Sequence, residues 1–340
     1  MRGVVQGVGF RPFVHALAWR ESLAGHVRNA GGSVVVEVEG GRAQLDAFTA
    51  ALSAEAPPLA QLESLQQATI AVVGETGFSI GASTQRAGDV FVPADAATCE
   101  ACLGELADRT DRRHAHPFIS CTDCGPRYTM VRGVPYDRAR TTMAGFAMCS
   151  TCRAEYEDPR DRRFHAESIA CHDCGPRLSM PIGDAADVLR DGGVLAVKGL
   201  GGYHLACLAS DAVAVARLRE KKRRVDKPFA IMTSAPERLV RLHPEEDALL
   251  RGPARPVVLA ARRHDAPLAA AVAPLSAWIG VMLPYTPVHH LLLAATGEAL
   301  VMTSANLSDE PIVIDDADAR AHLAGIADAF LAHDRAIHLR

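Results

Sequence analysis

The sequence has few aromatic residues and no long apolar run. Phe, Trp and Tyr together make up 5% of the 340 residues, whereas proteins that bind single-stranded RNA stack its bases on aromatic side chains. No apolar stretch approaches the ~18 residues of a membrane span. The first ten residues also lack the apolar segment and cleavage site of a signal peptide. We therefore expect a protein without membrane segments that acts in the cytoplasm.

The sequence also lacks an excess of charge of one sign. The chain has 36 Lys and Arg against 40 Asp and Glu, a formal net charge of -4. Such a balance gives no general attraction to nucleic acid or to anionic membranes. Hydrophobic residues make up 49% of the chain, which is enough for proper cores, and the length suggests two or three domains.

Residues 1–86 predict a small α+β sandwich. Its expected order, β-α-β-β-α-β, places two helices on one sheet. A hairpin turn at residues 30–32 precedes valines that alternate with polar residues, the pattern of a half-buried strand. The expected elements are strands at residues 4–5, 25–29, 34–38 and 70–73, and helices that begin near Pro12 and centre on Phe48.

The rest of the chain predicts two further domains. Residues 89–180 hold eight of the nine cysteines and too few apolar residues for a large core. Residues 181–340 are rich in Ala, Val and Leu, and strand and helix patterns alternate there, which indicates an α/β domain. Its strand candidates are residues 194–198, 229–232, 257–260 and 299–303.

The eight cysteines form one pattern that occurs twice. Two Cys-x-x-Cys pairs make up residues 99–124, and the same pattern returns fifty residues later over residues 149–174. Each second pair ends in Cys-Gly-Pro-Arg, at Arg127 and Arg177. The repeated cysteines are Cys99, Cys102, Cys121 and Cys124, then Cys149, Cys152, Cys171 and Cys174.

This spacing predicts two zinc ions held by cysteine thiolates. Two Cys-x-x-Cys turns complete a closed tetrahedral site of the structural kind, and cytoplasmic thiols stay reduced. Buried or redox-active cysteines are the alternative, which the fourfold repeat disfavours. We expect each zinc to use the cysteines of one repeat, although pairs interleaved between the repeats would fit the same spacing. Cys207 stands alone in an apolar stretch and reads as a core residue.

A glycine-rich turn near the N-terminus predicts an anion site. Successive backbone N–H groups beside a helix N-terminus form a concave anion-binding surface, and Arg11 adds a bidentate partner for phosphate. Asn29 on the next strand could orient a water molecule. A tight turn with a surface arginine is the alternative, because short glycine motifs are weak signals. The candidate phosphate-binding residues of the turn are Gln6, Gly7, Val8, Gly9 and Phe10, beside Arg11.

The last block predicts a second phosphate-binding cleft. A Lys-Gly-Leu-Gly-Gly-Tyr-His segment follows a strand, a basic run follows a helix, and small polar residues end another strand. A solvated basic face and strand-end capping are the alternatives. Together these groups could hold a triphosphate. The expected nucleotide-binding residues are Lys198, His204, Lys222, Arg224, Lys227, Ser304 and Asn306.

Two of these motifs resemble known families. The segment Val-Gln-Gly-Val-Gly-Phe-Arg at residues 5–11, with Gly-His-Val-Arg-Asn at residues 25–29, resembles the acylphosphatase signature. The resemblance implies that Arg11 binds an acyl phosphate and that Asn29 orients the attacking water. The basic run and the Ser-x-Asn at residues 304–306 resemble the YrdC/Sua5 family, which binds ATP and makes carbamoyl-type adenylates.

The order of the three blocks resembles the HypF family of hydrogenase-maturation carbamoyltransferases. The resemblance implies that carbamoyl phosphate is hydrolysed in the first block. Carbamate is then adenylated with ATP, as its Mg²⁺ complex, in the third block. A further transferase domain passes the carbamoyl group to the C-terminal cysteine of a HypE-like protein acceptor. The family's transferase domain has no counterpart here, so we expect a truncated form for which complete transfer is doubtful.

Two other functions fit parts of the sequence. A threonylcarbamoyl-adenylate synthase of the YrdC/Sua5 type would leave the first two blocks without a role. A zinc-dependent module that binds double-stranded RNA conflicts with the net charge and the scarcity of aromatic residues. We also expect the zinc ions to be structural, so that removing them uncouples hydrolysis from adenylation without abolishing hydrolysis.

Overall fold

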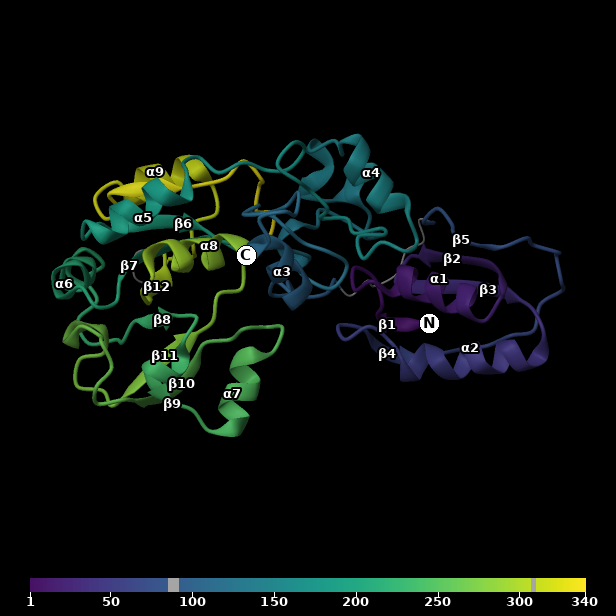
Figure 1. The fold of residues 1–340 in the computed structure, drawn as a ribbon, viewed down its shortest axis with the longest axis horizontal. Helices are drawn as coiled ribbons and strands as arrows, with labels where there is room; N and C mark the ends of the chain where they lie inside the picture. Colours follow the sequence, from purple (N-terminus) through teal and green to yellow (C-terminus); the bar gives the residue numbers. More distant parts are fainter. Residues whose placement is uncertain (85–91, 307–309) are drawn as a thin grey trace. The chain divides into compact units, whose positions relative to one another are not determined.

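A computed structural model describes residues 1–84, 92–306 and 310–340 (Figure 1). The described chain divides into two compact units. The first comprises Met1–Asp95 and Ser120–Gly175, and the second comprises Ala96–Ile119 and Pro176–Arg340. The domain boundary expected between residues 86 and 89 lies outside the described residues. Within the described ranges, no helix has the length and apolar character needed to cross a bilayer.

The first unit contains the predicted α+β sandwich. Its five-stranded sheet has the order β4-β1-β3-β2-β5, and α1 and α2 bury Val14, Leu17, Phe48 and Leu52 in one core with Val27 and Val34 of the sheet. The order β-α-β-β-α-β is confirmed up to β4, and β5 adds an edge strand. The elements are β1 (Arg2–Val4), α1 (Phe10–Arg20), β2 (Ala24–Ala30), β3 (Ser33–Glu39), α2 (Arg42–Ala54), β4 (Gln61–Ser64) and β5 (Phe78–Ile80).

The strand expected at residues 70–73 is wrong. This segment has no strand structure, and Val72 and Val73 are 82% and 77% exposed. The backbone N–H groups of Val73, Gly74 and Glu75 donate to the Glu39 carboxylate instead of to a neighbouring strand. The valines here are exposed and pack against no core, and without such packing their β propensity does not produce a strand.

The cysteine repeat produces a structural repeat. An eight-residue helix begins directly after the first cysteine of each half: α3 (Glu100–Ala107) after Cys99 and α4 (Ser150–Glu157) after Cys149. The segment between the halves has only three 3-10 turns, η1 (Tyr128–Met130), η2 (Arg138–Arg140) and η3 (Thr142–Gly145). The apolar cluster of the second half is small and is built from Cys152, Ala166, Ile169 and Cys171. As expected, these segments do not rest on a large core.

The second unit contains an eight-stranded mixed sheet of order β13-β6-β7-β12-β8-β11-β10-β9. Alternate residues of β6 face two separate cores. Leu195 and Val197 pack with α5 and α8, and Ala196 packs with α6 and α9. Helices therefore cover both faces of the sheet. The helices are α5 (Ile182–Arg190), α6 (Ala212–Lys221), α7 (Pro244–Arg251), α8 (Pro287–Thr296) and α9 (Asp316–Leu323), with the 3-10 turns η4 (Pro236–Arg238) and η5 (Ala270–Val272).

All four strands expected in the last block are present, and four more accompany them. Most neighbouring pairs are antiparallel; β6 with β13 and β8 with β11 are the parallel pairs within the described sheet. Cys207 on β7 is fully buried, which confirms its reading as a core residue. The strands are β6 (Leu195–Lys198), β7 (Tyr203–Leu208), β8 (Ala230–Met232), β9 (Val240–Arg241), β10 (Val258–Arg262), β11 (Trp278–Met282), β12 (Leu300–Ser304) and β13 (Ala329–Leu331).

Candidate functional site

The eight repeated cysteines gather into two clusters of four. Within each cluster the sulfur atoms all lie within 4.8 Å of one another. Each cluster uses the four cysteines of one repeat, so the expected local pairing is confirmed and interleaved pairs are excluded. The clusters are Cys99, Cys102, Cys121 and Cys124, and Cys149, Cys152, Cys171 and Cys174.

The sulfur spacing fits tetrahedral zinc. Four sulfurs about 2.3 Å from one ion lie about 3.8 Å apart at the corners of a tetrahedron. The observed separations are 3.8 Å for Cys121 and Cys124, 3.8 Å for Cys149 and Cys171, and 3.7 Å for Cys171 and Cys174. Four thiolates fill the coordination sphere and leave no position for water or substrate. Both sites therefore suit structural metal.

The glycine-rich turn has the backbone conformation of an anion cradle. Gly7 and Gly9 have φ of 71° and 73°, and Gly9 is the residue before α1. A Cβ on Gly7 would lie 3.3 Å from the ring of Tyr136, so that position excludes larger residues by space as well as by φ. The turn thus combines two left-handed glycines with the start of a helix, an arrangement that suits an anion site.

The other residues of the turn support it rather than line it. Val8 and Phe10 are each 1% exposed and belong to the core of the sandwich. The Gln6 amide donates to the carbonyl of Gly31 at 2.7 Å and accepts from the N–H of Tyr136 at 3.2 Å. Any part these three residues have in binding phosphate must come from their backbone.

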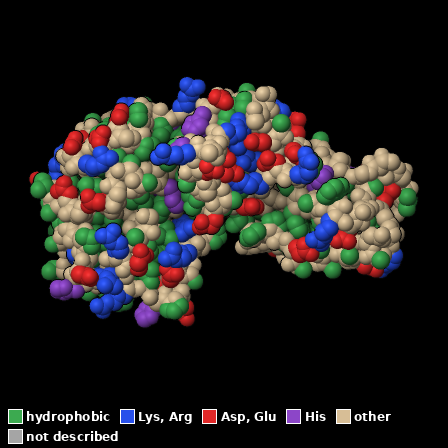
Figure 2. Space-filling model, viewed as in Figure 1, with side chains coloured by type: hydrophobic (Ala, Val, Ile, Leu, Met, Phe, Trp, Pro, Cys, Tyr) green, Lys and Arg blue, Asp and Glu red, His purple; other side chains and the backbone are tan. Residues whose placement is uncertain are grey.

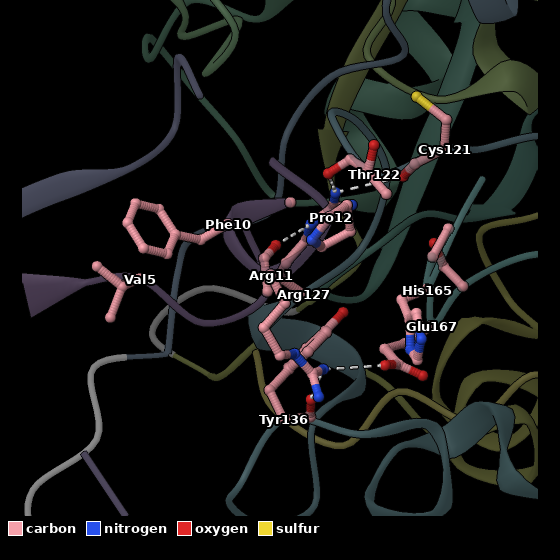
Figure 3. A pocket seen from close by; sticks show the side chains of 14 residues that line it. Val5, Phe10, Arg11, Pro12, Cys121, Thr122, Arg127, Tyr136, His165 and Glu167 are labelled. Carbon is pink, nitrogen blue, oxygen red and sulfur yellow. Dashed lines mark hydrogen bonds and ion pairs between the residues drawn. The ribbon is translucent and has the colours of Figure 1, made fainter. Parts of the chain in front are cut away.

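Arg11 is nearly buried, and three of its four partners lie between Cys124 and Cys171. One terminal nitrogen lies 3.0 Å from Asp137 Oδ1 and 3.5 Å from Ser83 Oγ. The other donates to the carbonyl of Tyr136 at 3.1 Å and to Glu167 Oε1 at 3.3 Å (Figure 3). The alternative of a surface arginine is therefore wrong.

Asn29 on β2 carries a buried amide with no partner. Its side chain is fully buried, and neither amide atom makes a hydrogen bond within the part of the chain that the structure describes. Its backbone carbonyl accepts from the N–H of Thr84 at 2.9 Å. Ser83, the residue before Thr84, contacts Arg11, so the two candidate catalytic residues share one neighbouring segment. Buried amides without partners are rare and point to a role in ligand or water binding.

Burial shapes the protonation of the groups around Arg11. It raises the pKa of the Glu167 carboxyl to about 7, against the opposing charge of Arg11. Burial, followed by the charge of Arg11, lowers the pKa of His165 to about 4. Burial also raises the pKa of Tyr156. Near neutral pH, His165 and Tyr156 are therefore uncharged, and Glu167 is close to its midpoint.

Two hollows meet at Arg11. A cavity of about 20 Å³ lies against the turn and is lined by Gly7, Gly9, Arg11 and Arg127 among others. A wider cleft of about 520 Å³ is lined by Arg11, Ser83, Asp137 and Arg138. Arg127 fixes the turn because its Nε donates to the carbonyl of Gly7 at 2.9 Å. Arg11 therefore lies between the small cavity at the turn and the wider cleft.

In the second unit, three of the expected nucleotide-binding residues come together. The Lys222 ammonium donates to the carbonyls of Ser304 and Asn306 at 2.6 and 2.9 Å. Ser304 Oγ donates to Asn306 Oδ1 at 2.7 Å. His204 on β7 lies directly opposite Ser304 on β12, so it borders the same end of the sheet.

The remaining candidates are placed differently. Lys198 is buried and pairs with Asp316 at 2.6 Å. Arg224 donates to the carbonyls of Lys227 and Pro228 and stacks over the ring of Phe229 at 4.9 Å. Lys227 is exposed. Arg224 therefore stabilises the turn that follows the basic run. Lys222 is the residue of this run that bonds to Ser304 and Asn306 among the described residues.

Basic and acidic side chains are intermixed on one face of the described chain (Figure 2). On the face shown in Figure 2, Lys and Arg side chains are mixed with Asp and Glu rather than gathered into a basic patch. A phosphate backbone would need a continuous positive surface. This agrees with the net charge of -4.

Sequence reasoning missed three residues of the first site: Arg127, Asp137 and Glu167. One signal was available. The repeat aligns position 167 with position 117, where the first half has Pro117. Only the second half has a carboxylate at this position, and Glu167 is buried. This difference between the halves indicates that Glu167 has a role other than supporting a zinc site.

Comparison with family models matches the three blocks separately. The acylphosphatase model covers residues 1–80, and the HypF finger model covers residues 98–131 and 148–180. The Sua5/YciO/YrdC model, described as telomere recombination, covers residues 187–340. The fold classes expected from the sequence are thereby confirmed.

Curated relatives match the whole chain. The carbamoyltransferase HypF of Rhodobacter capsulatus is 52% identical over 100% of this chain and 47% of the relative. The probable carbamoyltransferase HypF of Methanocaldococcus jannaschii is 41% identical over 99% of this chain and 46% of the relative. The chain spans about half the length of the curated relatives it matches.

Solved structures agree. A crystal structure of full-length HypF in the phosphate- and nucleotide-bound form matches 100% of this chain and 46% of that one, at 42% identity and a TM-score of 0.97. The crystal structure of HypF from T. kodakarensis matches with 40% identity and a TM-score of 0.92, over 100% of this chain and 46% of that one.

Proposed function

We propose that this chain, which matches HypF carbamoyltransferases over its whole length and about half of theirs, hydrolyses carbamoyl phosphate and adenylates the carbamate that results. The observation that supports this most is the first site itself. A buried arginine stands beside a glycine turn, and a buried amide without a partner lies on the adjoining strand. Few structural roles would justify leaving the Asn29 amide unpaired.

In the first step, the backbone N–H groups of the turn and Arg11 hold the phosphoryl group. The Asn29 amide orients a water molecule whose oxygen attacks phosphorus. The bond between phosphorus and the acyl oxygen then breaks, so that carbamate leaves with the bonding electrons. Donors fixed in advance stabilise the charge that develops on the phosphoryl oxygens. The products are inorganic phosphate and carbamate.

In the second step, carbamate and ATP, as its Mg²⁺ complex, react in the second unit. A carbamate oxygen attacks the α-phosphorus, and pyrophosphate leaves. Lys222, Ser304 and Asn306 are the groups we assign to the nucleotide, with Lys198 and His204 at the same end of the sheet. The carbamoyl adenylate would serve as donor to the C-terminal cysteine of a HypE-like acceptor.

We assign the two cysteine clusters to structural zinc. Zinc bound there would hold the polypeptide turns in place. We also keep the prediction of a cytoplasmic protein, since cysteine thiolates that hold metal suit a reducing compartment.

Phosphate release from carbamoyl phosphate tests the first step. Arg11→Ala should abolish it, because the guanidinium of Arg11 is the group we assign to the phosphoryl oxygens. Arg20→Ala is the matched control: Arg20 lies on the same helix, is half-exposed and pairs with Glu55 at 2.7 Å. Equal rates in both variants and the parent protein would refute the assignment.

Exchange of pyrophosphate into ATP tests the second step. Exchange should require carbamoyl phosphate and should not respond to threonine with bicarbonate. The opposite dependence would favour a threonylcarbamoyl-adenylate synthase. A salt-sensitive shift of double-stranded RNA, without exchange, would favour the RNA-binding alternative.

A further inference from the structure

A carboxylate of the second cysteine repeat contacts the arginine of the acyl phosphate site. Glu167 lies between α4 and Cys171, and its side chain is 2% exposed. Its Oε1 accepts from Arg11 at 3.3 Å. Within the described part of the acylphosphatase-like block, Ser83 contacts Arg11 through its hydroxyl, whereas the two carboxylates that contact Arg11 come from further along the chain.

The carboxylate of Glu167 is held in one orientation. Its Oε2 accepts from the Tyr156 hydroxyl at 3.1 Å and from the backbone N–H of Arg138 at 2.8 Å. Arg138 in turn donates from its guanidinium to the carbonyl of Glu167 at 2.7 Å. Both oxygens are therefore used, and the one that faces Arg11 cannot rotate away without breaking two other bonds.

Asp137 makes a different contact with the same arginine. It lies 3.0 Å from Arg11, but its side chain is 32% exposed, and it lines the wide cleft. Solvent screens such a contact and allows it to exchange. Of the two carboxylates, only Glu167 is buried enough to fix the guanidinium.

We propose that Glu167 is a positioning residue for Arg11, so that the second cysteine repeat completes the acyl phosphate site. This rests on the proposed hydrolysis. Glu167, Tyr156 and the Arg138 N–H form a rigid support that directs the guanidinium towards the turn at Gly7 and Gly9. The support stands on α4 and on the loop that leads to Cys171, both of which are fixed by the second cysteine cluster.

The proposal differs from one in which Glu167 only fills space or competes with phosphate. A positioning residue changes the binding of phosphate and the rate together, because a displacement of about 1 Å costs on the order of 100-fold in rate. A competing carboxylate would have the opposite effect on binding. Removing it would free the guanidinium, and phosphate would bind more tightly.

Hydrolysis of carbamoyl phosphate and the affinity for inorganic phosphate are measured in Glu167→Ala, Glu167→Gln and the parent. Glu167→Ala should lower kcat/KM roughly 100-fold, as such a displacement does, with weaker phosphate binding. Glu167→Gln keeps one acceptor oxygen for Arg11 but turns an NH2 group towards the Tyr156 hydroxyl and the Arg138 N–H, so it should recover only about tenfold of that loss. This partial rescue is not expected of a residue that only fills space.

Two further variants keep the test sound. Glu157→Gln on α4 is the matched control: Glu157 is 63% exposed and pairs only loosely with Arg153, at 3.7 Å, so no change is expected. Asp137→Asn retains the buried support and should lose less activity than Glu167→Ala, because solvent screens the contact of the more exposed carboxylate. The zinc content of the Glu167 variants shows whether they fold. If they do not, Asp137→Asn still tests the site. In that case, a loss of 100-fold in Asp137→Asn would overturn the proposal.

The outcomes separate the two proposals. If the parent releases no phosphate, the proposed function fails. If the parent is active and Glu167→Ala matches it, or binds phosphate more tightly, the positioning role is overturned while the function stands.

Discussion

Replacing Asn29 with valine should stabilise the protein and abolish the hydrolysis of carbamoyl phosphate. The side chain is fully buried, and neither amide atom has a partner among the described residues. Burying an unpaired polar group costs about 1–3 kcal/mol. Valine removes that cost, suits strand β2 and leaves no amide to orient water. We therefore expect a gain of about 1–3 kcal/mol in the local free energy of unfolding.

Hydrogen–deuterium exchange of peptides from β2 measures this gain without unfolding the other parts of the chain. A gain of about 1–3 kcal/mol slows exchange by a factor of about 5–150. Gln6→Met is the control, since Gln6 is also a buried amide of this site but bonds Gly31 and Tyr136. Methionine cannot form these bonds, so Gln6→Met leaves the Gly31 carbonyl and the Tyr136 N–H without the Gln6 amide and should speed exchange. Phosphate release from carbamoyl phosphate, measured in parallel, should be lost in Asn29→Val.

The opposite signs for two buried amides are the core of the prediction. If Asn29→Val speeds exchange as Gln6→Met does, the Asn29 amide is satisfied in solution, and its geometry no longer supports a catalytic assignment. If the variant is stabilised but keeps full activity, Asn29 has no role in hydrolysis.

Two other perturbations test the metal and nucleotide sites. Cys171→Ser should reduce bound zinc from two ions to one per chain by elemental analysis. It should also slow phosphate release, because the loop that carries Glu167 leads to this cysteine. An unchanged rate of phosphate release would instead support the expectation from the sequence that loss of zinc does not impair hydrolysis. Burial, and next the charge of Arg224, lower the pKa of Lys222 to about 8, so its positive charge is lost as pH rises from 7 to 9. Calorimetry should then show weaker ATP binding at pH 9, and Lys222→Arg should flatten that dependence; an unchanged affinity would remove Lys222 from the nucleotide site.

Local patterns predicted the elements whose signals are local. The cysteine spacing predicted both clusters, because a Cys-x-x-Cys turn brings its own two sulfurs together. The valines of residues 34–38 predicted β3, since alternate side chains of a strand face one core. The same reasoning failed at residues 70–73, where apolar residues are present but the fold provides no core opposite them.

The sequence by itself determined the three kinds of block, the two four-cysteine sets and the glycine turn with Arg11. Each depends on residues near one another in the chain, whose spacing carries the geometry. Only the tertiary structure decided what surrounds Arg11. Asp137 and Glu167 lie 126 and 156 residues further along the chain, and no local pattern links them to the turn. Burial also decided the protonation of Glu167, because removal of its carboxyl from water raises the pKa.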